Sequence, residues 1–133
     1  MISNNKYDYI ICGGGASGLL LSNALISDSF FDDKKILIIE KDAKVDNDKS
    51  FSFWDNESNI LDRIVFKSWE KAEFKDSEFS SSFNLSPYKY KMVRSDRFYS
   101  YMKKKIDKAS NFNYLNATVK DIDRNSNQNY VKT

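Results

Sequence analysis

The sequence predicts an α/β fold, the N-terminal half of a Rossmann-like doubly wound parallel sheet, and two patterns indicate it. First, a short apolar run at 9–12 (YIIC) leads into a glycine-rich loop at 13–18 and then into a segment with helical spacing at 19–26. Second, after a polar loop, another apolar run at 36–39 (ILII) ends on Glu40. Two such runs joined by a helix are typical of the buried parallel strands of a β-α-β unit.

The glycine-rich loop has the spacing Gly-x-Gly-x-x-Gly, in which each glycine has a physical role. Gly13 lets the backbone turn out of the strand, Gly15 lets a pyrophosphate approach the main chain, and Gly18 lets the helix pack close to the sheet. We expect the helix to begin at Gly18, where its unpaired N–H groups and its dipole favour a diphosphate. A glycine-rich turn alone is weak evidence, but the flanking strands and helix agree with a dinucleotide site.

Glu40 follows the loop by about 20 residues, the place where such a site carries an acid. Its carboxylate can accept hydrogen bonds from the adenosine ribose hydroxyls, which disfavours a 2′-phosphate and leaves FAD and NAD open. The predicted cofactor-binding residues are those of the loop, the acid with its neighbour, and one later arginine: Gly13, Gly14, Gly15, Ala16, Ser17, Gly18, Glu40, Lys41 and Arg94.

Composition narrows the class of protein. The 133 residues suit one small domain, and 30% charged with 15% aromatic residues suits a globular chain. A formal charge of +2 predicts no nucleic-acid partner, and the lysines at 103–105 are interpreted as a solvated helix end rather than a lipid or nucleic-acid patch. There is no signal-peptide core and no apolar run of about 20 residues, so we expect a cytoplasmic location, with contact to a membrane surface left open.

Cysteine and histidine usage excludes several kinds of chemistry. Cys12 is the single cysteine, so no internal disulfide or multi-cysteine metal site is expected, and its place in a strand indicates a small core residue. The absence of histidine removes Ser-His-Asp and Cys-His catalysis and histidine metal sites from this stretch. We predict no metal site.

The remaining segments are less regular. We predict a loop at 41–50, strands beginning at 51–54, 64–69 and 71–74, and a serine-rich turn or hairpin tip at 76–86. An alternating strand at 88–94 is followed by an amphipathic helix at 96–109, which Ser95 would cap and whose apolar face would carry Phe98, Met102, Ile106 and Ala109. A third parallel strand is predicted at 112–122 and a polar tail at 123–133. This series leaves sheet edges unpaired, so we expect residues 1–133 to be the N-terminal part of an FAD/NAD(P)-binding domain, with a substrate domain downstream.

Several segments together resemble the flavin-dependent lycopene cyclases of carotenoid biosynthesis, particularly the bacterial β-cyclase type. The matching segments cover essentially the whole chain: Asp8 to Gly18, Glu40, Asn47-Asp48-Lys49-Ser50-Phe51-Ser52-Phe53-Trp54, Trp69, and Tyr88 through Tyr99. Ser50 and Phe51 replace the usual Thr and Trp. The glycine loop is shared by many flavoproteins, whereas the segments at 47–54 and 88–99 are more specific.

The resemblance implies an FAD enzyme that closes the ends of lycopene into β-rings without net redox change. The flavin would work reduced, with NADPH as the source of electrons, and the substrate would be met at a membrane surface. The acids usually assigned to proton transfer lie beyond the equivalent of residue 133, so the catalytic residues of this chain are unknown and only the resemblance draws attention to Asp48 and Lys49.

Some alternatives remain open on the sequence. Trp54 and Phe53 are interpreted as core or interdomain packing in preference to polyene contacts. Arg94 either reaches the flavin diphosphate or ribityl chain, or pairs with Asp96 at the surface. The function itself could also be that of another flavoenzyme of the same fold, such as a monooxygenase or desaturase, or of a stand-alone dinucleotide-binding module.

Overall fold

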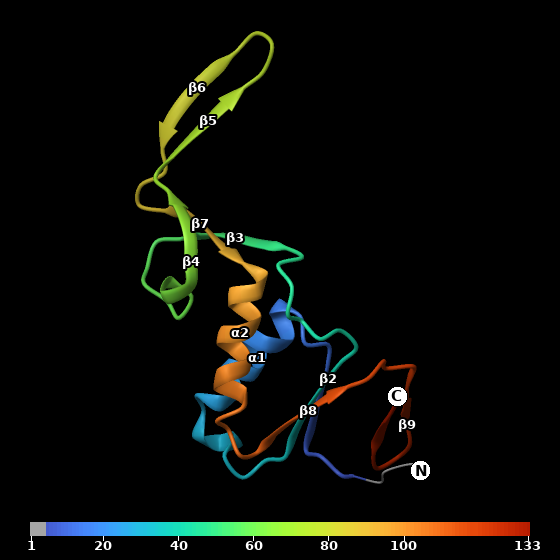
Figure 1. The fold of residues 1–133 in the computed structure, drawn as a ribbon. Coiled ribbons are helices and arrows are strands. Elements are labelled where there is room, and N and C mark those ends of the chain that lie inside the picture. The colour runs from blue at the N-terminus through green and yellow to red at the C-terminus, as the bar shows by residue number, and fades with distance from the viewer. Residues whose placement is uncertain (1–4) are drawn as a thin grey trace. The chain divides into compact units, whose positions relative to one another are not determined.

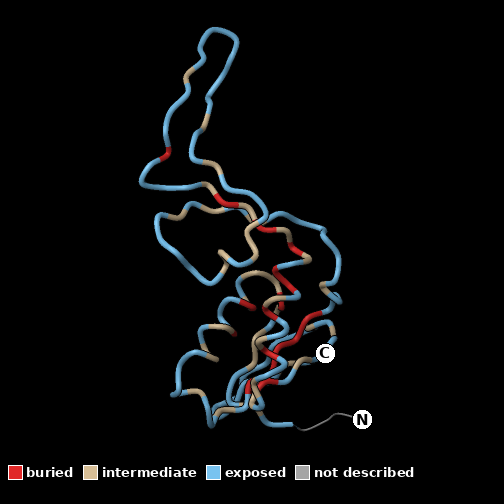
Figure 2. Tube along the Cα trace, turned by 60° about the vertical axis from the view of Figure 1, so that its left-hand side comes forward, coloured by how far each residue is buried: buried red, intermediate tan, exposed pale blue. Residues whose placement is uncertain are grey.

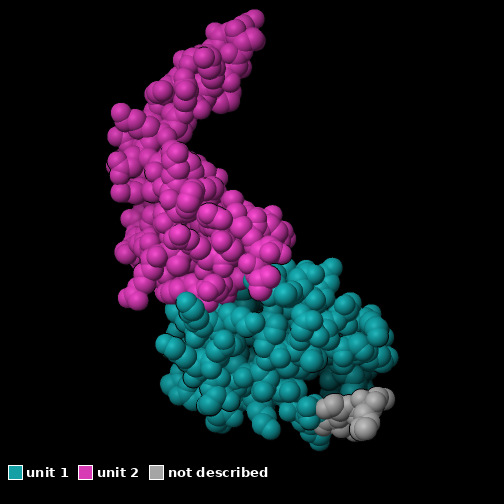
Figure 3. All heavy atoms as spheres, in the orientation of Figure 1, with its two compact units in different colours: residues 1–44, 102–133 teal, residues 45–101 magenta. Residues whose placement is uncertain are grey.

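The computed structural model describes residues 5–133, which form two compact units (Figures 1 and 3). Of the described residues, one unit holds 5–44 and 102–133, and the other holds 45–101. The boundary between them falls inside a helix, α2 (Ser95–Ile106).

A parallel three-stranded sheet organises the first unit. Strand β2 (Ile36–Glu40) lies between β1 (Tyr9–Cys12) and β8 (Phe112–Asn116), and α1 (Ala16–Ile26) connects β1 to β2. A 3-10 turn, η1 (Ser29–Phe31), precedes β2. The predicted β-α-β unit is therefore confirmed, with the helix beginning two residues before the expected Gly18.

Burial is greatest along the middle strand, all five residues of which are buried (Figure 2). The prediction that β1 is buried and that Cys12 is a core residue is wrong: the Cys12 side chain is exposed, and no residue of β1 is fully buried. The reason is the position of β1 at the edge of the sheet in residues 5–133, where β2 covers only one of its sides. Burial of a parallel strand needs neighbours on both sides as well as on its faces.

The doubly wound arrangement is present only in part. Parallel register aligns Ile11 with Ile38 and Ile38 with Tyr114, so these side chains share one face of the sheet. Helix α1 approaches that face at Ile11, and Lys103 of α2 lies 5.6 Å from the Tyr114 ring centroid. Both helices thus contact the same face, and the described residues contain no helix on the other.

Helix α2 confirms the predicted amphipathic face, because Phe98, Met102 and Ile106 are all buried. It ends at Ile106 rather than at 109, since the chain turns there to enter β8, with the Phe112 N–H donating to the Ala109 carbonyl at 3.1 Å. Ser95 is not the expected cap. It is the first helical residue, and its buried hydroxyl accepts the Lys49 N–H at 3.1 Å, so it holds the 46–49 loop instead.

The third parallel strand is shorter than predicted, and the polar tail is structured. β8 ends at Asn116, whose side-chain amide donates to the Glu40 and Lys41 carbonyls at 3.2 Å each, closing the end of the pairing with β2. The chain then forms an antiparallel hairpin of β9 (Asp121–Arg124) and β10 (Asn129–Lys132). Asn125 turns this hairpin by accepting the main-chain N–H groups of residues 127 and 128.

An antiparallel sheet organises the second unit. Its strand order is β3-β7-β4, with β3 at Ser50–Asp55, β4 at Val65–Trp69 and β7 at Lys89–Arg94, which confirms the three strands predicted there. A 3-10 turn, η2 (Asp62–Ile64), leads into β4.

A separate hairpin, β5 (Lys71–Lys75) with β6 (Ser80–Asn84), leaves this sheet (Figure 1). The prediction of a turn over 76–86 missed β6, because serines at 80–82 give no apolar alternation. Asp76 makes the actual tip by accepting the N–H groups of Glu78 and Phe79 at 2.8 Å.

Lys91 forms a partly buried ion cluster on the inner face of the β3-β7-β4 sheet. Its Nζ lies 2.8 Å from Asp55 Oδ2 and 2.6 Å from Asp62 Oδ1, and its side chain is 10% exposed. The Lys91 ammonium holds the pKa of both carboxyls below their ordinary value of 3.8, chiefly by hydrogen bonding, and the two carboxylates raise the pKa of Lys91. The cluster ties η2 and the end of β3 to the central strand.

This cluster predicts an acid-dependent stability. Because the folded-state pKa values of Asp55 and Asp62 are lowered, their contribution is present above about pH 4 and is lost as the pH falls further. We expect Lys91→Met to lower the urea midpoint at pH 7 and to flatten its dependence between pH 4 and 2, measured by circular dichroism. Lys89→Met is the matched control, since Lys89 pairs with Glu70 at the surface. Equal pH dependence in the two variants would contradict the role given to Lys91.

Candidate functional site

The glycine loop between β1 and α1 opens the candidate site. Gly13 has a φ of +112°, a conformation that favours glycine, and its N–H continues the sheet by donating to the Ile39 carbonyl at 2.8 Å. Gly15 is the N-cap residue of α1, and no side chain caps the helix there. The N–H groups of the first helical turn therefore have no side-chain cap and are available to an anion.

The loop is closed toward the sheet and open at Gly15. A Cβ added to Gly18 would overlap the Gly13 carbonyl oxygen and lie 3.3 Å from the Ile11 side chain, which confirms the close helix–strand packing predicted for Gly18. A Cβ on Gly14 would lie 2.7 Å from the Tyr114 hydroxyl and 2.9 Å from Glu40 Cβ. A Cβ on Gly15 would meet no atom within 4 Å, so the open side of the loop is at the residue expected to face a pyrophosphate.

Glu40 is buried at the end of β2, with 7% of its surface exposed. Its Oε2 accepts the Gly14 N–H at 2.7 Å, and its Oε1 accepts the Asp42 N–H at 3.0 Å. Lys44 Nζ lies 3.9 Å from Oε1. The sequence indicated that Glu40 accepts hydrogen bonds from a ribose, but it did not indicate these hydrogen bonds to the main chain of the protein. An ionised carboxylate has about four acceptor positions, so both roles are compatible.

Tyr114 is a site residue that sequence reasoning missed. Its hydroxyl lies against Gly14 on the Glu40 side of the loop. Burial, with the negative charges of Glu40 and Asp42, raises the pKa of Tyr114, so its hydroxyl stays protonated beside the carboxylate. The signal was the parallel register: Asn116 pairs with Glu40, and Tyr114, two residues earlier, projects from the same face.

The other predicted residues are placed as follows. Ala16 and Ser17 form the first turn of α1, with Ser17 exposed, and Lys41 is exposed beside Glu40. These residues lie in the same unit as the glycine loop. Arg94 belongs to the second unit, where it forms the surface ion pair with Asp96, at 3.5 Å from Nε to Oδ1. The Arg94 side chain is partly exposed, but its Nε atom is buried and makes no hydrogen bond.

The family-specific segment at 47–54 has a structural anchor. Asp48 Oδ1 lies 3.0 Å from the Ser95 hydroxyl and 3.5 Å from the Tyr99 hydroxyl, and Lys49 contributes its main-chain N–H to Ser95. Trp54 is 58% exposed, so it is not a core residue within the chain, and its interpretation as interdomain packing stays a prediction; Phe53 is half-buried.

Residues 5–133 contain no group of three acidic, histidine or cysteine side chains placed to hold a metal ion. No helix in that part of the chain is long and apolar enough to cross a membrane.

A strand, a glycine loop, a helix and a second strand that ends in a buried acid define the class of Rossmann-like dinucleotide-binding folds. The chain belongs to the lycopene cyclase family: the family model described as "Lycopene cyclase protein" matches residues 8–133. The resemblance found in the sequence is thereby confirmed. No curated protein sequence matches the chain.

Solved structures share the fold. They include a probable FAD-dependent monooxygenase from Pseudomonas aeruginosa (14% identity, TM-score 0.69, covering 92% of this chain and 36% of that one). A p-nitrophenol 4-monooxygenase from Pseudomonas putida has 14% identity and a TM-score of 0.71, with coverages of 92% and 35%. A flavin-dependent brominase has 17% identity and a TM-score of 0.66, with coverages of 94% and 35%. The chain thus spans about a third of the length of these proteins.

The packing at Gly18 generates a stability prediction. Gly18→Ala forces the loop and helix apart at a backbone contact, so we expect it to lower the free energy of unfolding by about 1–3 kcal/mol in urea titrations. Gly15→Ala is the matched control, because its Cβ has open space and its φ of −75° suits alanine. A Gly18→Ala midpoint equal to that of the control would refute the close approach.

Proposed function

We propose that the protein is a flavoenzyme that binds FAD through the glycine loop and Glu40 and cyclises the ends of lycopene to β-rings. The observation that carries this proposal is the match to the lycopene cyclase family over residues 8–133, since it includes the specific segments at 47–54 and 88–99.

The residues of the chain fit a dinucleotide. The pyrophosphate would lie against the uncapped first turn of α1 at Gly15, where no protein atom fills the space, and Glu40 would accept the ribose hydroxyls with its remaining lone pairs. Lys41 would stay at the rim beside Glu40. From the family resemblance we also propose that the Arg94 guanidinium supplies a charge-assisted donor to the flavin diphosphate or ribityl chain.

In the proposed activity the flavin is held reduced, with NADPH as the source of electrons, and the carotenoid undergoes no net oxidation. Proton addition to a terminal double bond, ring closure and proton loss need an acid and a base, and we assign neither role to residues 5–133. Because lycopene is a water-insoluble hydrocarbon, we propose that the enzyme is cytoplasmic and meets its substrate at a membrane surface.

A second candidate is another FAD-dependent oxidoreductase of the same fold. The observation that favours it is the likeness to two monooxygenases and a brominase. Their identities of 14–17% speak for the fold alone, which is why the cyclase is preferred.

The cofactor prediction concerns Gly15. We expect Gly15→Val to abolish flavin binding, because its branched side chain would occupy the space left for the pyrophosphate. The measurement is the 450 nm absorbance per protein after purification from the complete reading frame. Gly15→Ala, with one methyl in the same space, should retain more flavin than Gly15→Val. Wild-type flavin content in Gly15→Val would show that the cofactor lies elsewhere.

The reaction prediction concerns the product. Expression of the complete reading frame in a lycopene-accumulating host should give γ- or β-carotene, separated by chromatography. Hydroxylated, epoxidised or further desaturated products would favour the second candidate, as would unchanged lycopene in the presence of flavin-loaded protein.

A further inference from the structure

The two faces of the β3-β7-β4 sheet differ in their partners. Along β7, Lys91 and Val93 are buried and point to the inner face, where the Phe51 ring packs 5.1 Å from the Phe98 ring of α2. The alternate residues of β7 point outward and are only half-buried. An antiparallel sheet with one solvated face normally carries polar side chains on that face.

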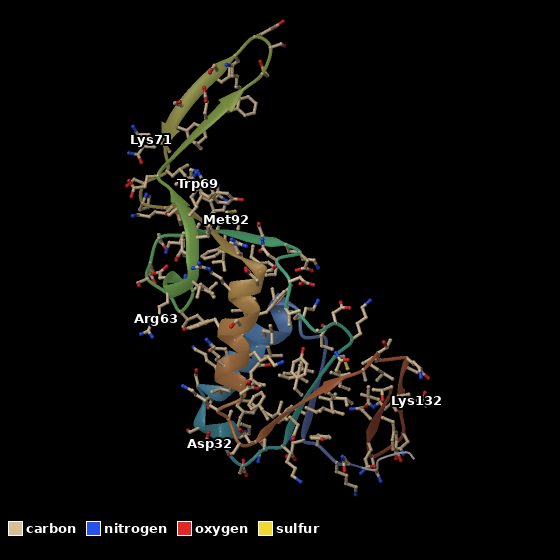
Figure 4. All side chains as sticks on the ribbon, in the orientation of Figure 1. Asp32, Arg63, Trp69, Lys71, Met92 and Lys132 are labelled. Atoms are coloured by element: carbon tan, nitrogen blue, oxygen red, sulfur yellow. The ribbon has the colours of Figure 1, made fainter. Side chains whose placement is uncertain are left out.

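The outer face carries a row of aromatic rings beside polar side chains. Register aligns Trp54 of β3 with Tyr90 of β7, and Tyr90 with Trp69 of β4. The ring centroids are 4.9 Å apart for the first pair and 5.9 Å for the second, so the three rings form a continuous row across the sheet. Met92, two residues after Tyr90 on β7, lies on the same face and pairs with Lys67 of β4; Figure 4 labels Met92 and Trp69. We call these four residues the aromatic face.

The chemistry of the aromatic face selects an apolar occupant. The cations at its border are already placed against rings, with Lys67 Nζ 5.3 Å from the Trp69 centroid and Arg94 Cζ 5.6 Å from the Phe66 centroid. Register places Ser52 and Lys67 beside Met92, so the apolar part of the face is the row of three rings, which offers π surfaces and one phenol hydroxyl. The row crosses two strand spacings, or about 10 Å, enough for one end of an extended polyene.

We propose that the aromatic face binds the polyene substrate, with the unsaturated chain lying along the Trp54–Tyr90–Trp69 row. This inference rests on the proposed function, because the family description names lycopene cyclase and lycopene is a C40 polyene without polar groups. Trp54, 58% exposed, contributes the largest uncovered ring of the row. The three aromatic residues are substrate-binding residues, and no proton transfer is assigned to them.

The test compares Trp54→Ala, Tyr90→Ala and Trp54→Phe in protein expressed from the complete reading frame. Phe74→Ala is the matched control, because Phe74 is 56% exposed but lies on the β5–β6 hairpin, away from the face. The probe is lycopene in phosphatidylcholine liposomes, and the measurements are lycopene transferred to the protein, KM, flavin content and Tm. Loss of one stacked ring should raise KM and weaken lycopene transfer about tenfold in the two alanine variants. Trp54→Phe should recover most of the loss, and flavin content and Tm should match those of the control.

Several results would overturn the inference, the proposed function or both. Unchanged transfer and KM in Trp54→Ala and Tyr90→Ala would show that the face does not hold the substrate. A fall in Tm and flavin content that accompanies every loss of binding, with Phe74→Ala unaffected, would show that polypeptide covers the face. A wild-type protein that takes up lycopene through these residues but makes no cyclic product would refute the proposed function alone. Cyclisation that is insensitive to both alanine variants would refute the inference alone, and a wild-type protein that neither takes up nor converts lycopene would refute both.

Discussion

The hydrogen bond from the Gly14 N–H to the buried Glu40 carboxylate is the interaction on which the candidate site depends. It joins the glycine loop to the end of β2, across 26 residues of sequence, and leaves a buried donor satisfied by a charged acceptor. The Glu40 side chain also restricts position 14 to glycine, since Glu40 Cβ leaves no room for a Cβ on Gly14. The conformation of the glycine loop therefore depends on the position of the Glu40 side chain, and a change at either residue would disturb the other.

The first unit shows which parts of such a site can be predicted from sequence. Apolar runs, glycine spacing and the terminal acid report local requirements of the backbone, and these predictions agree with β1, α1 and β2. Tyr114 was not predicted as a site residue, because its position beside Gly14 follows from the parallel register of β8 with β2, and no local sequence pattern encodes that register. Cys12 was misplaced for a related reason: the burial of a strand depends on its neighbours in the sheet, and β1 is an edge strand here.

Both faces of the antiparallel sheet in the second unit mix polar and apolar side chains. The Lys91 cluster lies on the covered face of its sheet, whereas two tryptophans and a tyrosine lie on the other. Alternation in the sequence located the strands but could not tell which set of alternate residues faces inward, because both sets contain large apolar side chains. Strand β6 and most of the β9–β10 hairpin were missed, because the serines of β6 and the polar residues at 123–133 gave no apolar alternation.

The β5–β6 hairpin adds a dynamic consequence. Its strands pair only with each other in the part of the chain that the structure describes, and Phe74, Phe79 and Phe83 are each about half exposed or more. A two-stranded ribbon with so few buried contacts has little free energy to resist opening, so its amide protons exchange with solvent through local fluctuations while the three-stranded sheet stays closed. Hydrogen exchange in this segment consequently measures a local equilibrium, and the global stability of the unit is read from the amides of β7.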